Sequence, residues 1–248
     1  MSKEESLTED QHRRSARPAY NHASYELSRR FLRFLIRYIG FTLLAKLDRV
    51  DGLENIPASG PALLMMNHLA FVDSLTVLHV CPRNVTPMAK IEVYDYPIIG
   101  LFPHLWGVIP VRREEIDRRA LQGALDVLKA GEIVLIAPEA TRSPQLQRGK
   151  EGVAYLAQRA NVPVVPVAIE GSPGFPAFRT SKRWKGEGVY IRFGRPFRYR
   201  IGQDRPDRDQ LRLMTDEALY YLASLLPEKR RGVYADLSQA TQNTIELL

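Results

Sequence analysis

Short apolar runs alternate with amphipathic stretches from residue 49 onward, and this alternation constrains the fold more than any other feature. Strand-like runs lie at residues 61–66, 85–89, 107–111, 132–137, 162–169 and 189–193. Helical patterns lie at residues 73–78, 114–130, 152–160 and 207–226. Strands that alternate with helices are typical of an α/β domain whose sheet is covered on both faces. The sequence therefore predicts a mixed, mainly parallel sheet flanked by helices.

The domain boundaries follow from where this alternation begins and ends. Residues 1–23 are polar and predict a flexible tail. Residues 24–48 predict one amphipathic helix, residues 49–236 the α/β domain, and residues 237–248 a C-terminal tail. The first 23 residues contain no apolar core typical of a signal peptide. No apolar run reaches the roughly 18 residues that a membrane-spanning helix needs.

The predicted N-terminal helix has an unusual composition. Residues 27–47 contain five basic side chains and no acidic one. On a helix, Arg29, Arg33 and Arg37 fall on one side, and aromatic and aliphatic residues fill most of the rest. This pattern is typical of a helix in a membrane interface, with arginines toward the headgroups. The alternative is a helix packed on the protein's own core, with its arginines on the wet side.

Charge and cysteine content narrow the class of partner. The net charge of +7 favours an anionic membrane, a phosphorylated substrate or nucleic acid. Residues 178–200 add eight basic side chains and one acid, Glu187. No nucleic-acid-binding motif is present, so we do not expect that partner. The single cysteine, Cys81, excludes an intramolecular disulfide, and no group of residues has the spacing of a metal site.

His68 and Asp73 are the strongest candidates for chemistry. His68 lies in the turn after the strand-like run at 61–66, and Asp73 lies at the start of the next helix. A carboxylate in the first helical turn can reach back to the imidazole and hold one ring nitrogen protonated. The other nitrogen is then free to take a proton from a hydroxyl. The pattern predicts the base and orienting acid of a Ser-His-Asp triad, with the substrate's hydroxyl replacing the serine.

Polar residues also follow three other strand-like runs. Arg112 ends residues 107–112, and Glu139, Thr141 and Arg142 lie in the turn at 138–143. Residues 162–166 (VPVVP) open another strand. Side chains just after strands gather at the carboxyl edge of an α/β sheet, where ligands bind. The arginines are suited to hold a phosphate.

Together, the NHxxxxD segment at 67–73 and the segments at 107–112, 138–143 and 162–166 resemble the glycerolipid acyltransferase family, which includes lysophosphatidic acid acyltransferases. The resemblance covers about residues 50–170. It implies a glycerol-3-phosphate acyltransferase-like fold and transfer of an acyl group from acyl-CoA or acyl carrier protein to a lysophospholipid, with no cofactor. The implied site residues are His68 as general base, Asp73 as its orienter, Arg112, Glu139, Thr141, Arg142, Lys90 and Lys150 for the acceptor, and Pro163 and Pro166 near the acyl chain.

Two departures from the family pattern bear on the acceptor. Ala140 stands where the family usually has Gly, and Ala70 stands where it often has Ser. The first choice is 1-acylglycerol-3-phosphate, which would give phosphatidic acid. A different lipid acceptor, or a non-catalytic lipid-binding protein on the same scaffold, is the alternative. The resemblance and the basic helix together predict a peripheral protein on the cytoplasmic face of a membrane.

Overall fold

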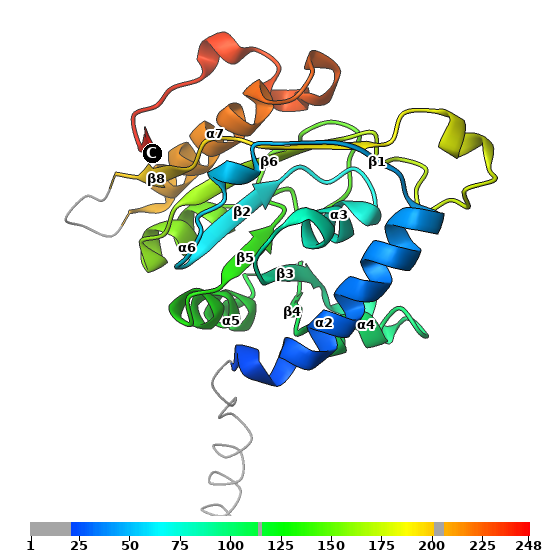
Figure 1. The fold of residues 1–248 in the computed structure, drawn as a ribbon. Helices are drawn as coiled ribbons and strands as arrows, with labels where there is room; N and C mark the ends of the chain where they lie inside the picture. The colour runs from blue at the N-terminus through cyan, green and yellow to red at the C-terminus, as the bar shows by residue number, and fades with distance from the viewer. Residues whose placement is uncertain (1–20, 114–115, 201–205) are drawn as a thin grey trace, which may run out of the picture.

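The computed structural model describes residues 21–113, 116–200 and 206–248, so most of the predicted N-terminal tail lies outside it. A nine-stranded sheet forms its centre (Figure 1). The strands are Leu47–Asp51 (β1), Ala62–Met66 (β2), Val85–Lys90 (β3), Ile109–Val111 (β4), Ile133–Ile136 (β5), Val164–Glu170 (β6), Val189–Phe193 (β7), Phe197–Tyr199 (β8) and Ile245–Leu247 (β9).

The sheet runs in the order β1-β7-β6-β2-β5-β3-β4, with β8 and β9 joined beside β6. All pairs from β6 through β2, β5 and β3 to β4 are parallel, and β1 is parallel to β7. The pairs β6–β7, β6–β8 and β8–β9 are antiparallel. This confirms the predicted mixed, mainly parallel sheet. Within the predicted tail at 237–248, β9 extends the sheet and Glu217 accepts hydrogen bonds from Thr241, Asn243 and Thr244.

Helices cover both faces of the sheet. The α-helices are Glu26–Leu35 (α2), Val72–Val80 (α3), Leu101–Trp106 (α4), Arg118–Lys129 (α5), Gly152–Ala160 (α6) and Arg208–Ser224 (α7). The other helical segments are His22–Tyr25 (η1), Ile36–Leu44 (η2), Leu53–Asn55 (η3), Ile91–Asp95 (η4), Lys182–Lys185 (η5), Glu228–Arg230 (η6), Gly232–Tyr234 (η7) and Leu237–Gln239 (η8). The π-helical segment η2 continues α2 directly.

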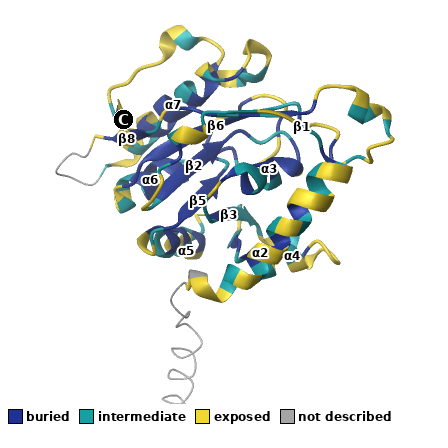
Figure 2. Ribbon diagram, viewed as in Figure 1, coloured by how far each residue is buried: buried dark blue, intermediate teal, exposed yellow. Residues whose placement is uncertain are grey.

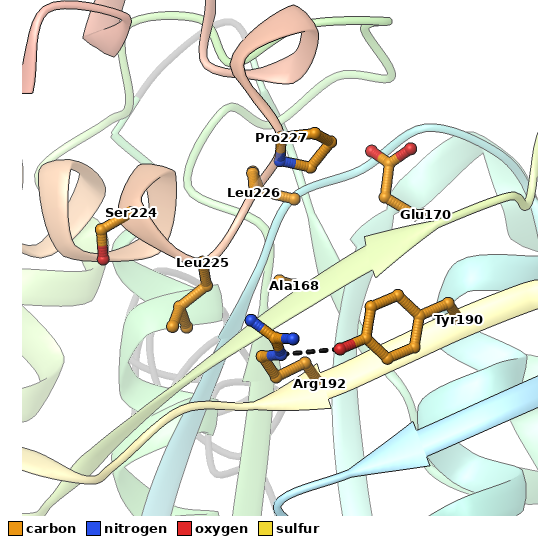
Figure 3. A pocket seen from close by; sticks show the side chains of 8 residues that line it. All are labelled: Ala168, Glu170, Tyr190, Arg192, Ser224, Leu225, Leu226 and Pro227. Carbon is orange, nitrogen blue, oxygen red and sulfur yellow. Dashed lines mark hydrogen bonds between the residues drawn. The ribbon is translucent and has the colours of Figure 1, made fainter.

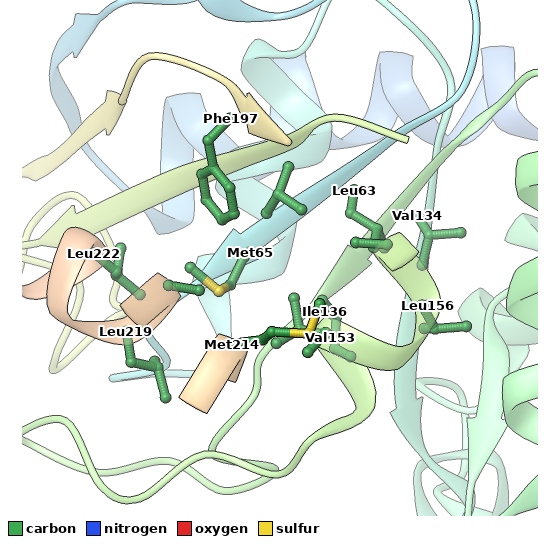
Figure 4. Packing of buried hydrophobic residues seen from close by; sticks show 14 of the residues in the cluster. Leu63, Met65, Val134, Ile136, Val153, Leu156, Phe197, Met214, Leu219 and Leu222 are labelled. Carbon is green, nitrogen blue, oxygen red and sulfur yellow. The ribbon is translucent and has the colours of Figure 1, made fainter. Parts of the chain in front are cut away.

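Alternating side chains of the central strands build two separate cores. In β2, Leu63 and Met65 face the core under α5, α6 and α7, which Figure 4 shows with Val153, Leu156 and Leu219 around them. The next side chains in line, such as Leu64, belong to the core under α2, α3 and α4. Because successive strand residues point to opposite faces, a run that is apolar throughout serves both cores.

Carboxylate caps determine where two helices begin. Asp117 accepts hydrogen bonds from the amides of Arg119 and Ala120, so α5 begins at Arg118. This start is later than the predicted residue 114, and residues 114–115 lie outside the described ranges. Asp207 forms a capping box with Gln210 at the start of α7. An acceptor at this position satisfies amides that have no partner within the helix.

The orientation predicted for the N-terminal helix is wrong. One interpretation put the arginines toward lipid headgroups and the other put them in water. Arg30 and Arg37 are exposed, but Arg29 is buried with 1% of its surface exposed. Its guanidinium pairs with Glu132 at 3.0 Å and donates to the Trp106 carbonyl and the Thr86 hydroxyl. Arg33 donates to the Arg83 carbonyl on the same side. The arginine face of α2 therefore binds the protein, because a distant carboxylate supplies its counter-charge.

The opposite face of α2 and η2 is apolar and exposed, as the outward bands of this helix in Figure 2 show. Leu27, Phe31, Phe34 and Tyr38 are 82%, 59%, 55% and 56% exposed. They repeat at helical spacing and form one stripe, which we call the apolar stripe. Among the helices of the described ranges, none is long and apolar enough to cross a membrane.

We expect Arg29→Met to lower the free energy of unfolding by about 3–5 kcal/mol, because it leaves Glu132 buried without its partner. Urea unfolding measures the change. Arg30→Met is the matched control, since Arg30 is paired with Glu26 on the surface and contributes only about 0.3–0.5 kcal/mol. The double variant Arg29→Met/Glu132→Leu should recover most of the loss. Equal stability of the Arg29 and Arg30 variants would contradict this account.

Candidate active site

His68 and Asp73 lie together at the carboxyl end of β2, as their spacing predicts. Nδ1 of His68 is 2.9 Å from Oδ2 of Asp73. The same Oδ2 accepts hydrogen bonds from the amides of Leu69 at 2.6 Å and Ala70 at 2.7 Å. An ionised carboxylate only accepts, so the proton between the two side chains belongs to Nδ1. Nε2 then carries the free lone pair of a general base.

The turn that carries His68 is anchored to the neighbouring strand. The buried Asn67 side chain donates to the Ile169 carbonyl at 2.9 Å and accepts from its amide at 2.8 Å. Asp73 itself lies in the first turn of α3, where a negative charge is favoured by the helix dipole. The His68 side chain keeps 12% of its surface exposed while Asp73 has none. The imidazole can thus meet a substrate that the carboxylate never touches.

Glu139 lies beside this pair and is more buried than a substrate-contacting residue would be, with 6% of its surface exposed. Its Oε2 accepts from the Gln147 amide at 2.8 Å. Burial raises the pKa of Glu139 to about 7, and the Asp73 charge adds to the rise. Hydrogen bonds from the Gln147 and His68 amides oppose it. The structure therefore shows Glu139 holding the backbone of the His68 turn, whereas the sequence suggested a residue of the acceptor pocket.

Ala140 has a left-handed backbone, with φ of 55°. This is the position at which the family usually has Gly, and the conformation is one that glycine adopts without penalty. For an L-residue it costs roughly 1–2 kcal/mol. The turn keeps its shape because Ser143 donates its amide to the His68 carbonyl at 2.9 Å. Alanine in place of glycine at position 140 therefore adds backbone strain, but the turn keeps its conformation.

Arg113, rather than Arg112, joins the positive charges near the turn. Arg112 is exposed, and its amide bonds Asp117 at the start of α5. Burial lowers the pKa of the Arg113 guanidinium, Glu92 opposes this, and the charge of Arg142 lowers the pKa further. Both arginines follow the end of β4, and Arg113 is the one that the Arg142 charge reaches. The assignment of Arg112 to the acceptor stays a prediction.

The other predicted acceptor-binding residues surround this cluster. Lys150 Nζ donates to the Arg113 carbonyl. Arg142 is exposed and lies over the Phe71 ring, 5.9 Å from its centroid. Lys90 ends β3 with its ammonium 5.9 Å from the Tyr96 ring centroid. Thr141 is exposed in the same turn as Arg142.

Gly107 links this region to the N-terminal helix. It ends α4 with φ of 75°, and a Cβ at this position would lie 2.9 Å from the Tyr25 ring. Glycine is therefore required both by the backbone conformation and by the close approach of Tyr25. The glycine of the segment at 107–112 is therefore explained by the packing of the N-terminal helix against it.

The two prolines assigned to the acyl chain lie within the sheet rather than beside His68. The Pro163 carbonyl accepts from Leu63 at the amino end of β2, and Pro166 pairs with Met65 in mid-strand. His68 follows the other end of β2. Pro163 is level with Ala62, and β2 ends at Met66, so at about 3.3 Å per residue Pro163 is roughly 13 Å from that end. An acyl chain at His68 would have to run along the sheet to reach it.

A cavity of about 370 Å³ lies between β6, β7 and the end of α7 (Figure 3). Its charged groups already have protein partners. Glu170 pairs with Arg230 at 2.7 Å, and the Arg192 Nε donates to the Tyr190 hydroxyl at 2.7 Å. None of the residues that line it belongs to the four segments singled out in the sequence. We assign no ligand to this cavity.

A histidine held by a carboxylate, with arginines nearby at the carboxyl edge of the sheet, is the arrangement that the sequence resemblance implies. The profile of the Acyltransferase family matches residues 49–170, which include all four motif segments. Residues 49–170 are an acyltransferase domain. The matched range begins at β1 and ends with β6, so it covers the strands that carry His68, Glu139 and Arg113.

Named acyltransferases are similar to this chain in sequence and in fold. A chloroplastic 1-acyl-sn-glycerol-3-phosphate acyltransferase of Arabidopsis thaliana is 34% identical over 130 residues, which are 50% of this chain and 36% of that protein. The 1-acyl-sn-glycerol-3-phosphate acyltransferase of Bacillus subtilis is 29% identical over 170 residues, 68% of this chain and 82% of that protein. The crystal structure of the LPA acyltransferase PlsC from Thermotoga maritima matches with a TM-score of 0.57 and 25% identity, over 77% of this chain and 78% of that one.

We expect the stability of this protein to fall as Glu139 ionises. The folded protein keeps the proton up to about pH 7, whereas the ordinary value is 4.5. Ionisation therefore opposes folding, and the free energy of unfolding should drop by about 3 kcal/mol across that window as the pH rises. Urea unfolding of the wild type and Glu139→Gln at about pH 5 and about pH 8, on either side of this pKa, isolates this group. A stability difference between the two proteins that does not vary with pH would contradict the assignment.

Proposed function

We propose that the protein transfers a fatty acyl group from a thioester, acyl-CoA or acyl carrier protein, to the hydroxyl of 1-acylglycerol-3-phosphate, giving phosphatidic acid. The observation that carries this proposal is the 2.9 Å contact between His68 Nδ1 and Asp73 Oδ2, which leaves Nε2 to accept a proton. The relatives named for this reaction support the choice of acceptor. The acyltransferase domain supports the class of chemistry.

The reaction needs one proton acceptor and no covalent enzyme intermediate. Nε2 of His68 takes the proton as the acceptor hydroxyl attacks the thioester carbonyl, and Asp73 stabilises the imidazolium that forms. The C–S bond then breaks, and the imidazolium returns the proton to the departing thiolate. The products are the new ester and the free thiol, so the base is regenerated.

We further propose that Arg113 and Arg142 hold the acceptor's phosphate. The Arg142 charge adds to the burial that lowers the pKa of Arg113, and a dianion between the two guanidiniums would relieve this repulsion. The Lys150 bond to the Arg113 carbonyl fixes the segment that presents one of them. The Ala140 methyl group takes up space in the turn that also carries Arg142. A different lipid hydroxyl is therefore the second choice of acceptor.

We also propose that the protein is peripheral at a membrane, where both lipid substrates reside. The apolar stripe of α2 is the supporting observation, because large aromatic side chains at helical spacing face outward. The arginines of α2 that the sequence analysis directed to lipid headgroups, Arg29 and Arg33, bind the protein instead. The aliphatic and aromatic side chains therefore form the lipid-facing surface.

We expect His68→Ala to lower kcat by about 10²–10⁴-fold, because the general base is lost. Asp73→Asn should lower kcat strongly as well, since it no longer fixes the tautomer. The measurement is release of free thiol and formation of phosphatidic acid from lysophosphatidic acid and acyl-CoA. His104→Ala, an exposed histidine on α4, is the matched control and should be unaffected. Turnover by His68→Ala at the wild-type rate would refute the mechanism.

Arg113 and Arg112 provide a matched pair for the phosphate site. Arg113→Ala should raise KM for lysophosphatidic acid by tenfold or more, since a charge-assisted bond contributes about 1.5–3 kcal/mol. Arg112→Ala should change KM less than twofold or so, because exposed charges contribute about 0–1 kcal/mol. The reverse order of effects would assign the phosphate to Arg112. Monoacylglycerol, which lacks the phosphate, should not distinguish the two variants.

A further inference from the structure

The turn at residues 96–101, between η4 and α4, presents bare aliphatic side chains to water. Ile98 is 91% exposed, and Ile99 and Leu101 are 47% and 59% exposed. The turn is held by its own backbone: Gly100 donates to the Tyr96 carbonyl at 2.8 Å and Leu101 to the Ile98 carbonyl at 3.1 Å. The exposed side chains therefore stand on an ordered support.

Ile98 is also the residue that this turn tolerates least. Its φ is 66°, in the left-handed region that β-branched side chains rarely adopt. Asn or Gly would suit the same backbone without exposing an aliphatic group. Single exposed apolar residues are common in soluble proteins. An exposed one that is also strained, with two more beside it, indicates a surface that something apolar covers.

The turn is joined through α4 to the helix that carries the apolar stripe. Helix α4 follows the turn directly and packs against α2, where Ser28 donates to the Leu105 carbonyl at 2.6 Å and Arg29 to the Trp106 carbonyl at 2.9 Å. In Figure 1, the green turn beside α4 extends past α2 at the right-hand edge of the molecule. The stripe and the turn are thus two apolar points on one rigid body.

A third apolar point lies at the far end of η2. Phe178 is 72% exposed, in a loop tied to η2 by the Ala177 amide bond to the Leu44 carbonyl at 2.7 Å. Exposed Arg179, Lys182 and Lys185 surround it. The stripe, the turn and Phe178 are three exposed apolar groups that suit the hydrocarbon of a bilayer. The cations near Phe178 suit anionic headgroups. A flat, extended, anionic and apolar partner fits this combination.

We propose that the turn at residues 96–101 inserts into the interface of an anionic bilayer as a second anchor beside α2. This rests on the proposed peripheral location and not on acyl transfer itself. The turn connects β3, which ends at Lys90, with β4, which leads to Arg113. Insertion therefore holds the chain segment between Lys90 and Arg113 at the lipid surface, which is the source of the acceptor.

A polar replacement that suits the backbone separates the lipid contact from the fold. Ile98→Asn should weaken binding to phosphatidylcholine vesicles containing phosphatidylglycerol by about tenfold, because one isoleucine leaves the lipid. Its unfolding midpoint should be unchanged or higher, since Asn tolerates positive φ. Val233→Asn is the matched control: Val233 is β-branched, 60% exposed and lies in η7. Binding by Ile98→Asn within twofold or so of the control would overturn the proposal.

A fluorescent label reports the insertion directly. The sole cysteine, Cys81, is buried, and burial raises the pKa of its thiol, so an introduced cysteine is labelled selectively. An environment-sensitive dye on Ile98→Cys should shift to the blue when these vesicles are added, and the same dye on Val233→Cys should not. An unshifted Ile98→Cys spectrum contradicts insertion. A blue shift that instead grows with protein concentration in buffer alone would assign the turn to a second copy of the chain.

Acyl transfer distinguishes this proposal from the proposed function. With a water-soluble short-chain acceptor, Ile98→Asn should turn over at the wild-type rate, whereas with acceptor embedded in vesicles it should be several-fold slower. A wild-type enzyme that is inactive on both acceptors but still binds vesicles through Ile98 would refute the reaction and keep the second anchor. If the wild type is active and Ile98→Asn keeps full activity on vesicles, the reaction stands and the second anchor is refuted.

Discussion

The Asp73 carboxylate is the interaction on which the site depends. One oxygen accepts from the His68 imidazole and from two consecutive backbone amides, so it defines the turn and the tautomer together. This works because Asn67 ties the same turn to β6, in the middle of the sheet. Charge-assisted bonds of this kind are short and directional. The base is therefore set in place before any substrate arrives.

Around this pair, burial and charge are arranged differently on the two sides. Glu139 is enclosed beside Asp73, and its raised pKa reports how little water reaches that side. Arg142 and Lys150 are exposed on the other side, with Arg113 half-buried between them and the core. The carboxylates lie on the buried side of His68 and the cations on the exposed side, which suits the anionic acceptor proposed above.

The N-terminal helix belongs to the folded domain through its arginines. Arg29 reaches Glu132 at the start of β5, and Tyr25 packs on Gly107. These contacts turn the aromatic side chains of the helix outward, where they are exposed as Ile98 and Phe178 are. One buried ion pair thus determines which surface of the protein is apolar.

Periodicity alone predicted the central strands and the longer helices, because apolar runs such as residues 62–66 and 133–136 serve two cores. The spacing of His68 and Asp73 predicted their contact, since a helix start brings a carboxylate back to the preceding turn. The direction of Arg29 was not predictable, because its partner Glu132 lies 103 positions away. The sequence did not single out Arg113, because its proximity to the Arg142 charge depends on how the chain bends after β4. The short strands β8 and β9 depend on tertiary pairing rather than on their own pattern.

The tautomer of His68 tests the central claim most directly. Nitrogen-15 NMR of histidine-labelled protein at neutral pH reports each ring nitrogen separately, with Asp73→Asn to assign the signals. The account predicts a protonated Nδ1 and a bare Nε2 at His68, with loss of that preference in Asp73→Asn. A bare Nδ1 beside a protonated Nε2 in the wild type would contradict it, because the nitrogen that faces the substrate would then have no lone pair to offer.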